Sequence, residues 1–192
     1  MSRRSAVVQL ALGGAVLGVT TVRAWRPQPS QLELDCFEAV NSLPDAISAP
    51  LWPVMQLGAL AAVPAVAGVV WWRGARGRAV HLLVSGSATW VVAKGVKRLV
   101  QRGRPAAVVA AARIRGLEQS GDGFISGHAA ISAALAAGAR PLVPGASPVL
   151  AALAATVAFA RLYVGAHLPL DVVGGAATGL IVDAVLELAR PT

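Results

Sequence analysis

Six long, mostly apolar stretches set the strongest limit on how this chain can fold. They cover residues 6–22, 51–72, 79–96, 129–143, 149–164 and 170–188. A helix needs roughly 20 apolar residues to cross a hydrocarbon core about 30 Å thick, and lipid leaves the backbone of an open, irregular segment without hydrogen-bond partners. The pattern therefore predicts an all-α, polytopic membrane protein built as a bundle of six transmembrane helices.

The composition agrees with a membrane location and argues against nucleic acid as a partner. Of the 192 residues, 56% are hydrophobic and only 14% are charged, and the formal net charge is +8. The cations lie at the ends of the apolar stretches rather than along an exposed face with stacking aromatic residues, as a nucleic-acid site would require. Ser2-Arg3-Arg4 before the first stretch resembles a signal peptide, but no small-x-small cleavage site follows near residues 22–25, so we expect an uncleaved first span.

Two regions are expected to form one domain. Residues 1–48 would supply the first transmembrane helix and a short amphipathic helix at the membrane interface, and residues 49–192 the catalytic core with its five transmembrane helices. The interfacial helix is predicted to begin at Ser30-Gln31-Leu32-Glu33, a capping-box pattern, and to end around residues 41–44.

Short basic loops favour the cytoplasm. The turn with Arg73, Arg76 and Arg78 therefore indicates a cytoplasmic N-terminus. Other cations near the ends of the apolar stretches are expected to be topology markers or snorkelling side chains, namely Lys94, Arg98, Arg102 and Arg140.

Three motifs gather cations, histidines and a carboxylate at stretch ends. They are Lys97-x6-Arg104-Pro105, Ser126-Gly127-His128 and Arg161-x5-His167-x3-Asp171. Odd-numbered spans end, and even-numbered spans begin, on the same side of a membrane. The sequence thus predicts that all three motifs meet at one surface, the external one if the N-terminus is cytoplasmic.

These motifs resemble the three-part signature of the type 2 phosphatidic acid phosphatase (PAP2) superfamily of membrane lipid phosphatases. The resemblance spans roughly residues 50 to 190, with the motifs in the family's order. Two positions depart from it: Ile125 stands where a proline is usual, and Ala160 where a serine is usual. Neither change removes a group that would transfer a proton or bond to phosphorus.

The residue types themselves indicate phosphoryl chemistry. His167 and Asp171 are spaced so that the carboxylate can orient the imidazole for attack on phosphorus, and the resemblance implies a phosphohistidine intermediate. His128 is placed to act as general acid and base. The remaining candidates would bind the phosphate through charge or through free amides at a helix start, namely Lys97, Arg104, Ser126, Gly127 and Arg161. This chemistry requires no metal and no cofactor.

Residues 106–125 are expected to form an external loop with a short interfacial helix. In it, Arg113 and Arg115 are possible headgroup contacts, with a solvated positive edge as the alternative. Asp122 is read as a loop residue between two glycines rather than a second acid. Gly174, Gly175 and Gly179 are expected to permit close helix contact.

The predicted function is a metal-independent lipid phosphatase in the cell membrane, with its active site on the external, extracytoplasmic face. A polyprenyl diphosphate such as undecaprenyl diphosphate, or a related isoprenoid phosphate, is the favoured substrate, because the compact chain resembles bacterial members that recycle cell-wall carriers. Phosphatidylglycerophosphate or phosphatidic acid is the alternative lipid. A module that only binds or transports lipid phosphate is the non-enzymatic alternative. The sequence does not specify an oligomeric state.

Overall fold

The computed structural model describes residues 2–26 and 28–190, and the regular structure in these ranges is helical. The long helices of the bundle are α1 (Arg3–Ala24), α4 (Ala62–Trp72), α5 (Arg76–Val100), α7 (Gly127–Ala139), α8 (Ser147–Tyr163) and α9 (Pro169–Ala189). Shorter elements connect them: α2 (Gln31–Asn41), η1 (Asp45–Ile47), α3 (Ser48–Met55), η2 (Gln56–Gly58), α6 (Pro105–Val108) and η3 (Arg140–Leu142). The expected all-α class is confirmed.

Helix α7 lies at the centre of the bundle and packs against α5, α8 and α9. Nine of its residues are buried, most of them alanine. Small side chains let the neighbouring backbones come close. A Cβ added at Gly179 of α9 would collide with the backbone carbonyl of Ala130 in α7, which bears out the expectation of close helix contact at this glycine.

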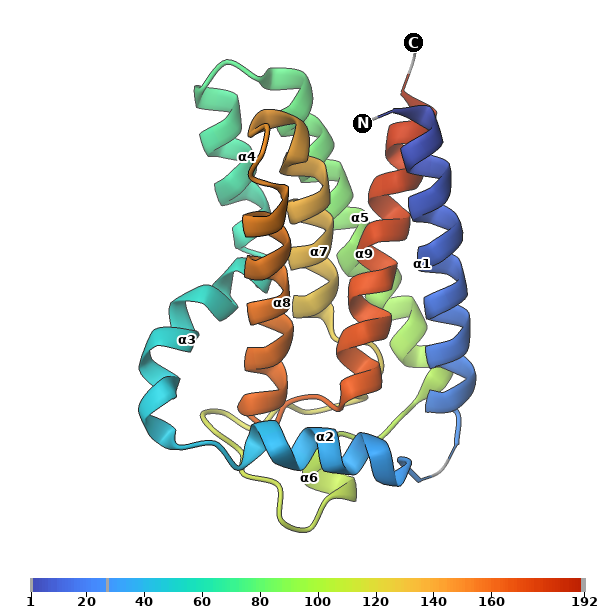
Figure 1. Ribbon diagram of the computed structural model, residues 1–192, viewed down its shortest axis with the longest axis vertical. Helices are drawn as coiled ribbons and strands as arrows, with labels where there is room; N and C mark the ends of the chain where they lie inside the picture. Colours follow the sequence, from blue (N-terminus) through green and yellow to red (C-terminus); the bar gives the residue numbers. More distant parts are fainter. Residues whose placement is uncertain (1, 27, 191–192) are drawn as a thin grey trace.

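Helix α1 packs along α9 over most of its length (Figure 1). Gly13 of α1 faces Ile181 of α9 at close range, and the side chain of Gln9 donates hydrogen bonds to the carbonyl of Leu180 and to Asp183. The opposite face of α1 exposes large apolar side chains, as a lipid-facing surface would: Val7, Val8, Leu12, Val16, Val19 and Val22. The N-terminal segment is thus joined to the rest of the bundle.

The expected count of six full spans is not confirmed. Within the described residues, three helices are long and apolar enough to cross a membrane, near residues 3–24, 76–108 and 169–189. A fourth span exists only if the pair Asp45–Gly58 and Ala62–Trp72, bent by 73°, counts as one. Helix α7, with 13 residues, rises only roughly 20 Å, so its expected span is too short for a full crossing.

The predicted straight span over residues 51–72 is broken between η2 and α4. Ala59 adopts an extended backbone conformation that ends the first helix. Gly58 packs directly on the backbone of His128, since a Cβ at this position would lie 2.5 Å from its carbonyl oxygen. The break therefore places α3 beside α8, away from the axis of α4.

The amphipathic helix α2 lies across one end of the bundle, with α6 below it, and the start of α1 and the end of α9 lie at the other end (Figure 1). Its predicted bounds are confirmed. Asn41 at its end binds the backbone carbonyls of Arg113 and Tyr163, and the hydroxyl of Tyr163 donates to the carbonyl of Pro44. These bonds attach α2 to the loops at that end.

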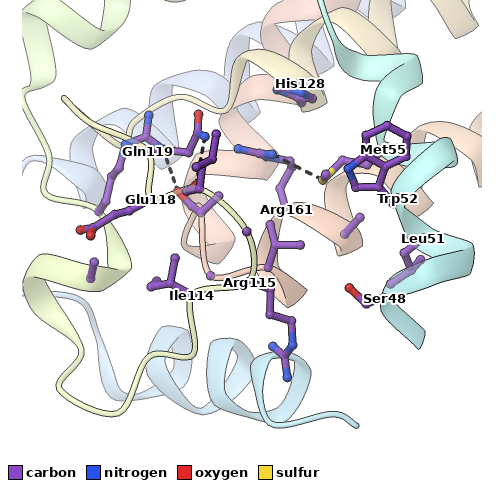
Figure 2. A pocket seen from close by; sticks show the side chains of 18 of the residues that line it. Ser48, Leu51, Trp52, Met55, Ile114, Arg115, Glu118, Gln119, His128 and Arg161 are labelled. Carbon is purple, nitrogen blue, oxygen red and sulfur yellow. Dashed lines mark hydrogen bonds between the residues drawn. The ribbon is translucent and has the colours of Figure 1, made fainter. Parts of the chain in front are cut away.

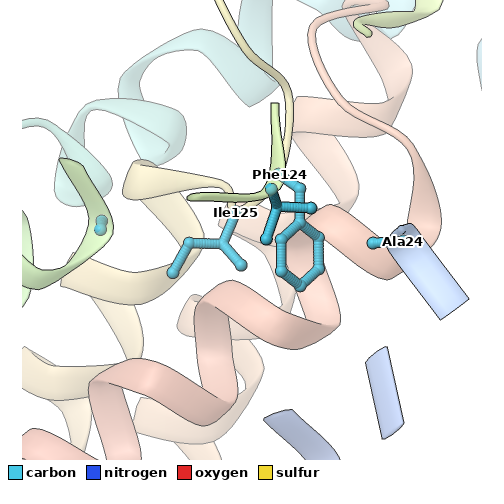
Figure 3. Packing of buried hydrophobic residues seen from close by; sticks show 5 residues of the cluster. Ala24, Phe124 and Ile125 are labelled. Carbon is cyan, nitrogen blue, oxygen red and sulfur yellow. The ribbon is translucent and has the colours of Figure 1, made fainter. Parts of the chain in front are cut away.

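A small hydrophobic cluster closes the same end between α1, α5 and α9. Phe124 and Ile125 are fully buried in it with Ala24 (Figure 3). Their side chains lie against Gly174, where an added Cβ would approach within 2.9 Å of the Phe124 ring. Ile125 therefore fills core space and supports the segment that leads into Ser126.

Candidate active site

His167 and Asp171 lie at the start of α9, and both are buried. The tight turn after α8 uses Gly165 with φ +74, a conformation that glycine adopts without strain. His167 Nδ1 lies 3.4 Å from Asp171 Oδ2 and has no hydrogen bond within the described residues. The other ring nitrogen, Nε2, points away from the carboxylate and is the one that could attack phosphorus.

His167 is neutral at physiological pH. Burial lowers its pKa to about 4, with a further contribution from the positive charges of Arg161 and Lys97, although Asp171 acts in the opposite direction. A neutral imidazole keeps a lone pair for bond formation, whereas the imidazolium does not. The site thus holds a histidine in its nucleophilic form.

Lys97 and Arg104 surround this pair from the end of α5 and the following loop. Lys97 Nζ donates to the carbonyl oxygens of Asp122 and Gly123, at 2.8 and 3.0 Å. Arg104 donates through Nε to Gly121 and through Nη1 to the carbonyl of Ala166. Each side chain has further N–H donors beyond these two, so both can hold the loop and still bind an anion.

Arg161 is only 5% exposed, yet its guanidinium lacks a full set of hydrogen-bond acceptors among the described residues. Within the part of the chain that the structure describes, its Nε is buried with no hydrogen bond, and Nη1 bonds only to the sulfur of Met55, at 3.4 Å. A buried guanidinium without an acceptor is unfavourable. An anionic ligand would supply the missing acceptors, which makes Arg161 the strongest indication of a phosphate site.

A cavity of about 530 Å³ is lined by three of the predicted site residues, Arg104, His128 and Arg161. Figure 2 shows the guanidinium of Arg161 and the ring of His128 beside Trp52 and Met55 of α3. Ala160 also lines the cavity. The cavity therefore combines an apolar wall with a cationic floor, as a lipid headgroup and its phosphate would need.

The start of α7 presents its backbone to the same region. Ser126 is the N-cap, and its hydroxyl accepts from the amide of Ala129 at 3.4 Å. The prediction of a free backbone amide at Ser126 is wrong, because this amide donates to the backbone carbonyl of Asp171 at 2.8 Å. The amides of Gly127 and His128 stand in the first helical turn, where the helix itself offers no acceptor, and they can still face an anion.

Arg113 and Arg115 lie beside the cavity but do not share one role. Arg113 is exposed and makes only a long side-chain bond to the carbonyl of Ser42. Arg115 points away from the cavity toward α2 in Figure 2 and donates to Asp45 and to three backbone carbonyls, while its guanidinium stacks over Tyr163. Its donors are engaged in holding the loops together, so we do not assign it to the headgroup.

Arg102 and Glu33 contact Asp171 and were not predicted as site residues. Arg102 was expected to be a topology marker, yet it is buried and donates to both carboxylates. Glu33 was expected to close a capping box, but only the Ser30 half of that box forms, and the Glu33 side chain turns inward. The capping pattern explained the glutamate locally, so nothing in the sequence pointed to its distant partner.

A second buried polar cluster lies at the opposite end of α5 and α9. Among the described residues, His81, Asp183 and Glu187 place one potential ligand atom each within 4.8 Å of one another. His81 Nε2 already binds Asp183 at 2.8 Å, and Arg78 pairs with Glu187. A metal ion would have to compete with the Arg78 cation, so we assign no metal there. The bond between His81 and Asp183 gives two buried polar side chains a partner.

Two solved structures are similar to this one. The crystal structure of Aquifex aeolicus LpxE has a TM-score of 0.73 and 20% sequence identity, over 84% of this chain and 97% of that chain. The crystal structure of the first transmembrane PAP2 type phosphatidylglycerolphosphate phosphatase from Bacillus subtilis has a TM-score of 0.67 and 17% identity, over 95% and 94%. At these identities the likeness establishes the fold. No curated protein matches the sequence.

The PAP2 superfamily matches residues 78–191, which include all three motifs. The match covers more than half of the chain, and the motif residues within it lie near His167 and Arg161 in the structure. The resemblance inferred from the motifs is therefore confirmed, and the protein is a membrane phosphatase that belongs to the PAP2 superfamily.

Proposed function

We propose that this protein removes a phosphate group from a lipid through a phosphohistidine intermediate, without a metal ion. The observation that carries the proposal is the buried guanidinium of Arg161, whose Nε has no hydrogen-bond partner among the described residues and which lines a cavity together with His128 and with Ala166, the neighbour of His167 in the chain. An anion is the ligand that such a donor lacks. A nucleophile with its orienting carboxylate would serve no purpose in a module that only binds.

The reaction follows from the positions of the side chains. His167 Nε2 attacks phosphorus and the bond from phosphorus to the leaving oxygen breaks, which is the bridging oxygen of a diphosphate or the ester oxygen of a monoester. His128 gives a proton to that oxygen. Burial and the charge of Arg161 lower the pKa of His128 to about 3, so His128 takes up this proton together with the anionic substrate, whose negative charge favours the imidazolium. Neutral His128 then takes a proton from water, which attacks the phosphohistidine and releases phosphate. Lys97, Arg104 and Arg161 stabilise the charge on the phosphoryl oxygens throughout.

A polyprenyl diphosphate is the proposed substrate. A diphosphate carries more negative charge than a monoester, and three cations converge on this site. The apolar side chains of Leu51, Trp52 and Met55 line the outer part of the cavity and suit a lipid chain. Phosphatidylglycerophosphate is the second candidate, because one of the similar structures is a phosphatase named for that lipid.

Phosphate release by the detergent-solubilised protein tests the proposal. The panel contains a polyprenyl diphosphate, phosphatidylglycerophosphate and phosphatidic acid, each assayed with and without a chelator. We expect release that the chelator does not affect and that His167→Ala abolishes, and protein denatured in alkaline detergent should carry phosphate on histidine, because phosphohistidine is stable to base and labile to acid. Equal release from the wild type and His167→Ala would refute the assignment, and chelator-sensitive release would refute the metal-free reaction.

A further inference from the structure

A buried ion triad lies directly behind the His167–Asp171 pair. Arg102 Nη1 donates to Asp171 Oδ1 at 3.0 Å and to Glu33 Oε1 at 2.9 Å, and Nη2 donates to Glu33 Oε2 at 2.6 Å. The three side chains are 6%, 4% and 0% exposed for Arg102, Glu33 and Asp171. Three charges withdrawn from water are unfavourable unless their geometry and hydrogen bonding are very good. The bidentate Arg102–Glu33 contact meets that condition.

We propose that Arg102 and Glu33 are positioning residues for the phosphatase reaction, which fix the Asp171 carboxylate so that it orients His167. This inference rests on the proposed function of the site. It adds two residues to the reaction that contact neither the cavity nor the phosphate, and one of them comes from the interfacial helix α2.

Asp171 is held at both oxygens. Oδ1 accepts from Arg102, and Oδ2 accepts from the backbone amide of Leu168 at 2.9 Å while it lies 3.4 Å from His167 Nδ1. Loss of the Arg102 bond would leave the carboxylate held only through Oδ2, by the amide of Leu168, and so less restricted about its Cβ–Cγ bond. The ring of His167 would then lose the acceptor that sets its tautomer and direction. A misdirected nucleophile reduces turnover without weakening substrate binding.

Glu33 fixes Arg102 in turn. Its Oε1 also accepts from the backbone amide of Leu170 at 3.0 Å, so Glu33 bridges α2, Arg102 and the first turn of α9. Ser30 caps α2 through its own side chain, which leaves the glutamate available for this bridge. Helix α2 therefore supplies the counterion of Arg102, in addition to its predicted role at the membrane interface.

Arg102 and Glu33 carry opposite charges, so removing each charge should have an opposite effect on the protonation of His167. The other ionisable groups that face His167 are Lys97 from α5, Arg161 from α8 and His128 from α7, and these stay constant in the variants. Removal of the Arg102 charge leaves Asp171 uncompensated, which favours protonation of His167. Removal of the Glu33 charge leaves Arg102 uncompensated, which disfavours it. The acid limb of the pH–activity profile should therefore move up in pH for Arg102→Gln and down for Glu33→Gln.

The experiment compares Arg102→Gln, Arg102→Lys and Glu33→Gln with the wild type in detergent, using one polyprenyl diphosphate and measuring kcat, KM and the pH profile. We expect kcat to fall by roughly 10- to 100-fold for Arg102→Gln and by about 10-fold for Glu33→Gln, with KM within about twofold. Arg102→Lys keeps the charge but loses the planar fork. It should restore the position of the acid limb but not the full kcat.

Glu187→Gln is the matched control. It breaks a buried contact with Arg78 at the other end of the same two helices. A helix of 25 residues separates the two ends by roughly 37 Å. This variant should lose thermal stability, as the triad variants do, but keep the wild-type kcat and pH profile. If Arg102→Gln does not fold, Glu33→Gln and Arg102→Lys still test the inference through kcat and the acid limb.

A double-mutant cycle with Asp171→Asn completes the test. If Arg102 acts through Asp171, Arg102→Gln should have little further effect on kcat in the Asp171→Asn background. The positioning role would be overturned by an unchanged kcat in the triad variants, or by a loss of kcat without opposite shifts of the acid limb. In either case, wild-type activity that depends on His167 would still support the proposed function. A wild type without phosphatase activity would overturn both.

Discussion

The backbone amide of Ser126 donates to the backbone carbonyl of Asp171 at 2.8 Å. This bond joins the first residue before α7 to the first turn of α9. His128 and His167 follow and precede these residues by a few positions, so the proposed general acid and the proposed nucleophile belong to one rigid unit. The spacing of the two histidines is therefore set by the contact of α7 with α9, where glycines replace side chains.

Gly175 in α9 should not tolerate a larger residue. An added Cβ would collide with the carbonyl oxygen of Ser126, so Gly175→Ala would push α7 away from α9 and disturb both histidines. We expect a destabilisation of about 1–3 kcal/mol and a marked loss of kcat, measured by thermal unfolding and phosphate release. Gly14→Ala is the control, because among the described residues no neighbouring side chain or element lies within 4 Å of its Cβ position. It should be neutral or stabilising, and equal effects of the two changes would contradict the close-contact argument.

Arg161→Lys should lower kcat/KM by roughly 100-fold, since one lost donor to developing charge commonly has an effect of this size. Lysine retains the charge but offers no planar fork for the phosphoryl oxygens. It also lacks a donor equivalent to Arg161 Nε, which has no hydrogen-bond partner among the described residues. Steady-state kinetics on a polyprenyl diphosphate measure the change. Arg140→Lys, near the opposite end of the bundle, should leave the kinetics unaltered. A wild-type rate in Arg161→Lys would remove Arg161 from the phosphate site.

Acid should destabilise the protein partly through His167. Its pKa in the fold is about 4, whereas an exposed histidine titrates near ~6.5. Between these values the unfolded chain binds more protons than the folded one, so the free energy of unfolding falls as the pH drops from about 6.5 to about 4. The loss from this group is about 3 kcal/mol.

Thermal unfolding of the solubilised protein between pH 7 and pH 4 measures that loss. His167→Gln has no titrating ring and should lose less stability over the same range. Identical acid sensitivity of the two proteins would show that His167 is not buried in the neutral form.

The side of the membrane that carries the active site can be tested through the single cysteine. Cys36 is exposed on α2, at the same end of the bundle as His167. A membrane-impermeant maleimide should label it in intact cells if the site is external, as we propose. Gly77→Cys in a Cys36→Ser background is the control, because Gly77 lies in the first turn of α5 at the other end and has open space around it. That variant should be labelled only after lysis, and the reverse pattern would place the active site in the cytoplasm.

The sequence by itself determined the helical class, the three motifs and their common end of the bundle. These depend on local properties: apolar length, the spacing of His167 and Asp171 across one turn, and the alternation of chain direction between consecutive helices. The same local logic explains the position of α2, whose bounds follow from Ser30 and the residues after Asn41.

Only the tertiary structure decided which charges meet. Arg102 looked like any cation at a helix end, and Glu33 like part of a cap, but 69 positions of chain separate these two partners. The helix break at Ala59 and the hydrogen bonds of Arg115 to α2 likewise depend on contacts between elements that are distant in the sequence, so a short stretch of sequence does not reveal them. A buried charge must find its counterion wherever the fold brings one, so long-range pairing rather than local pattern decides its role.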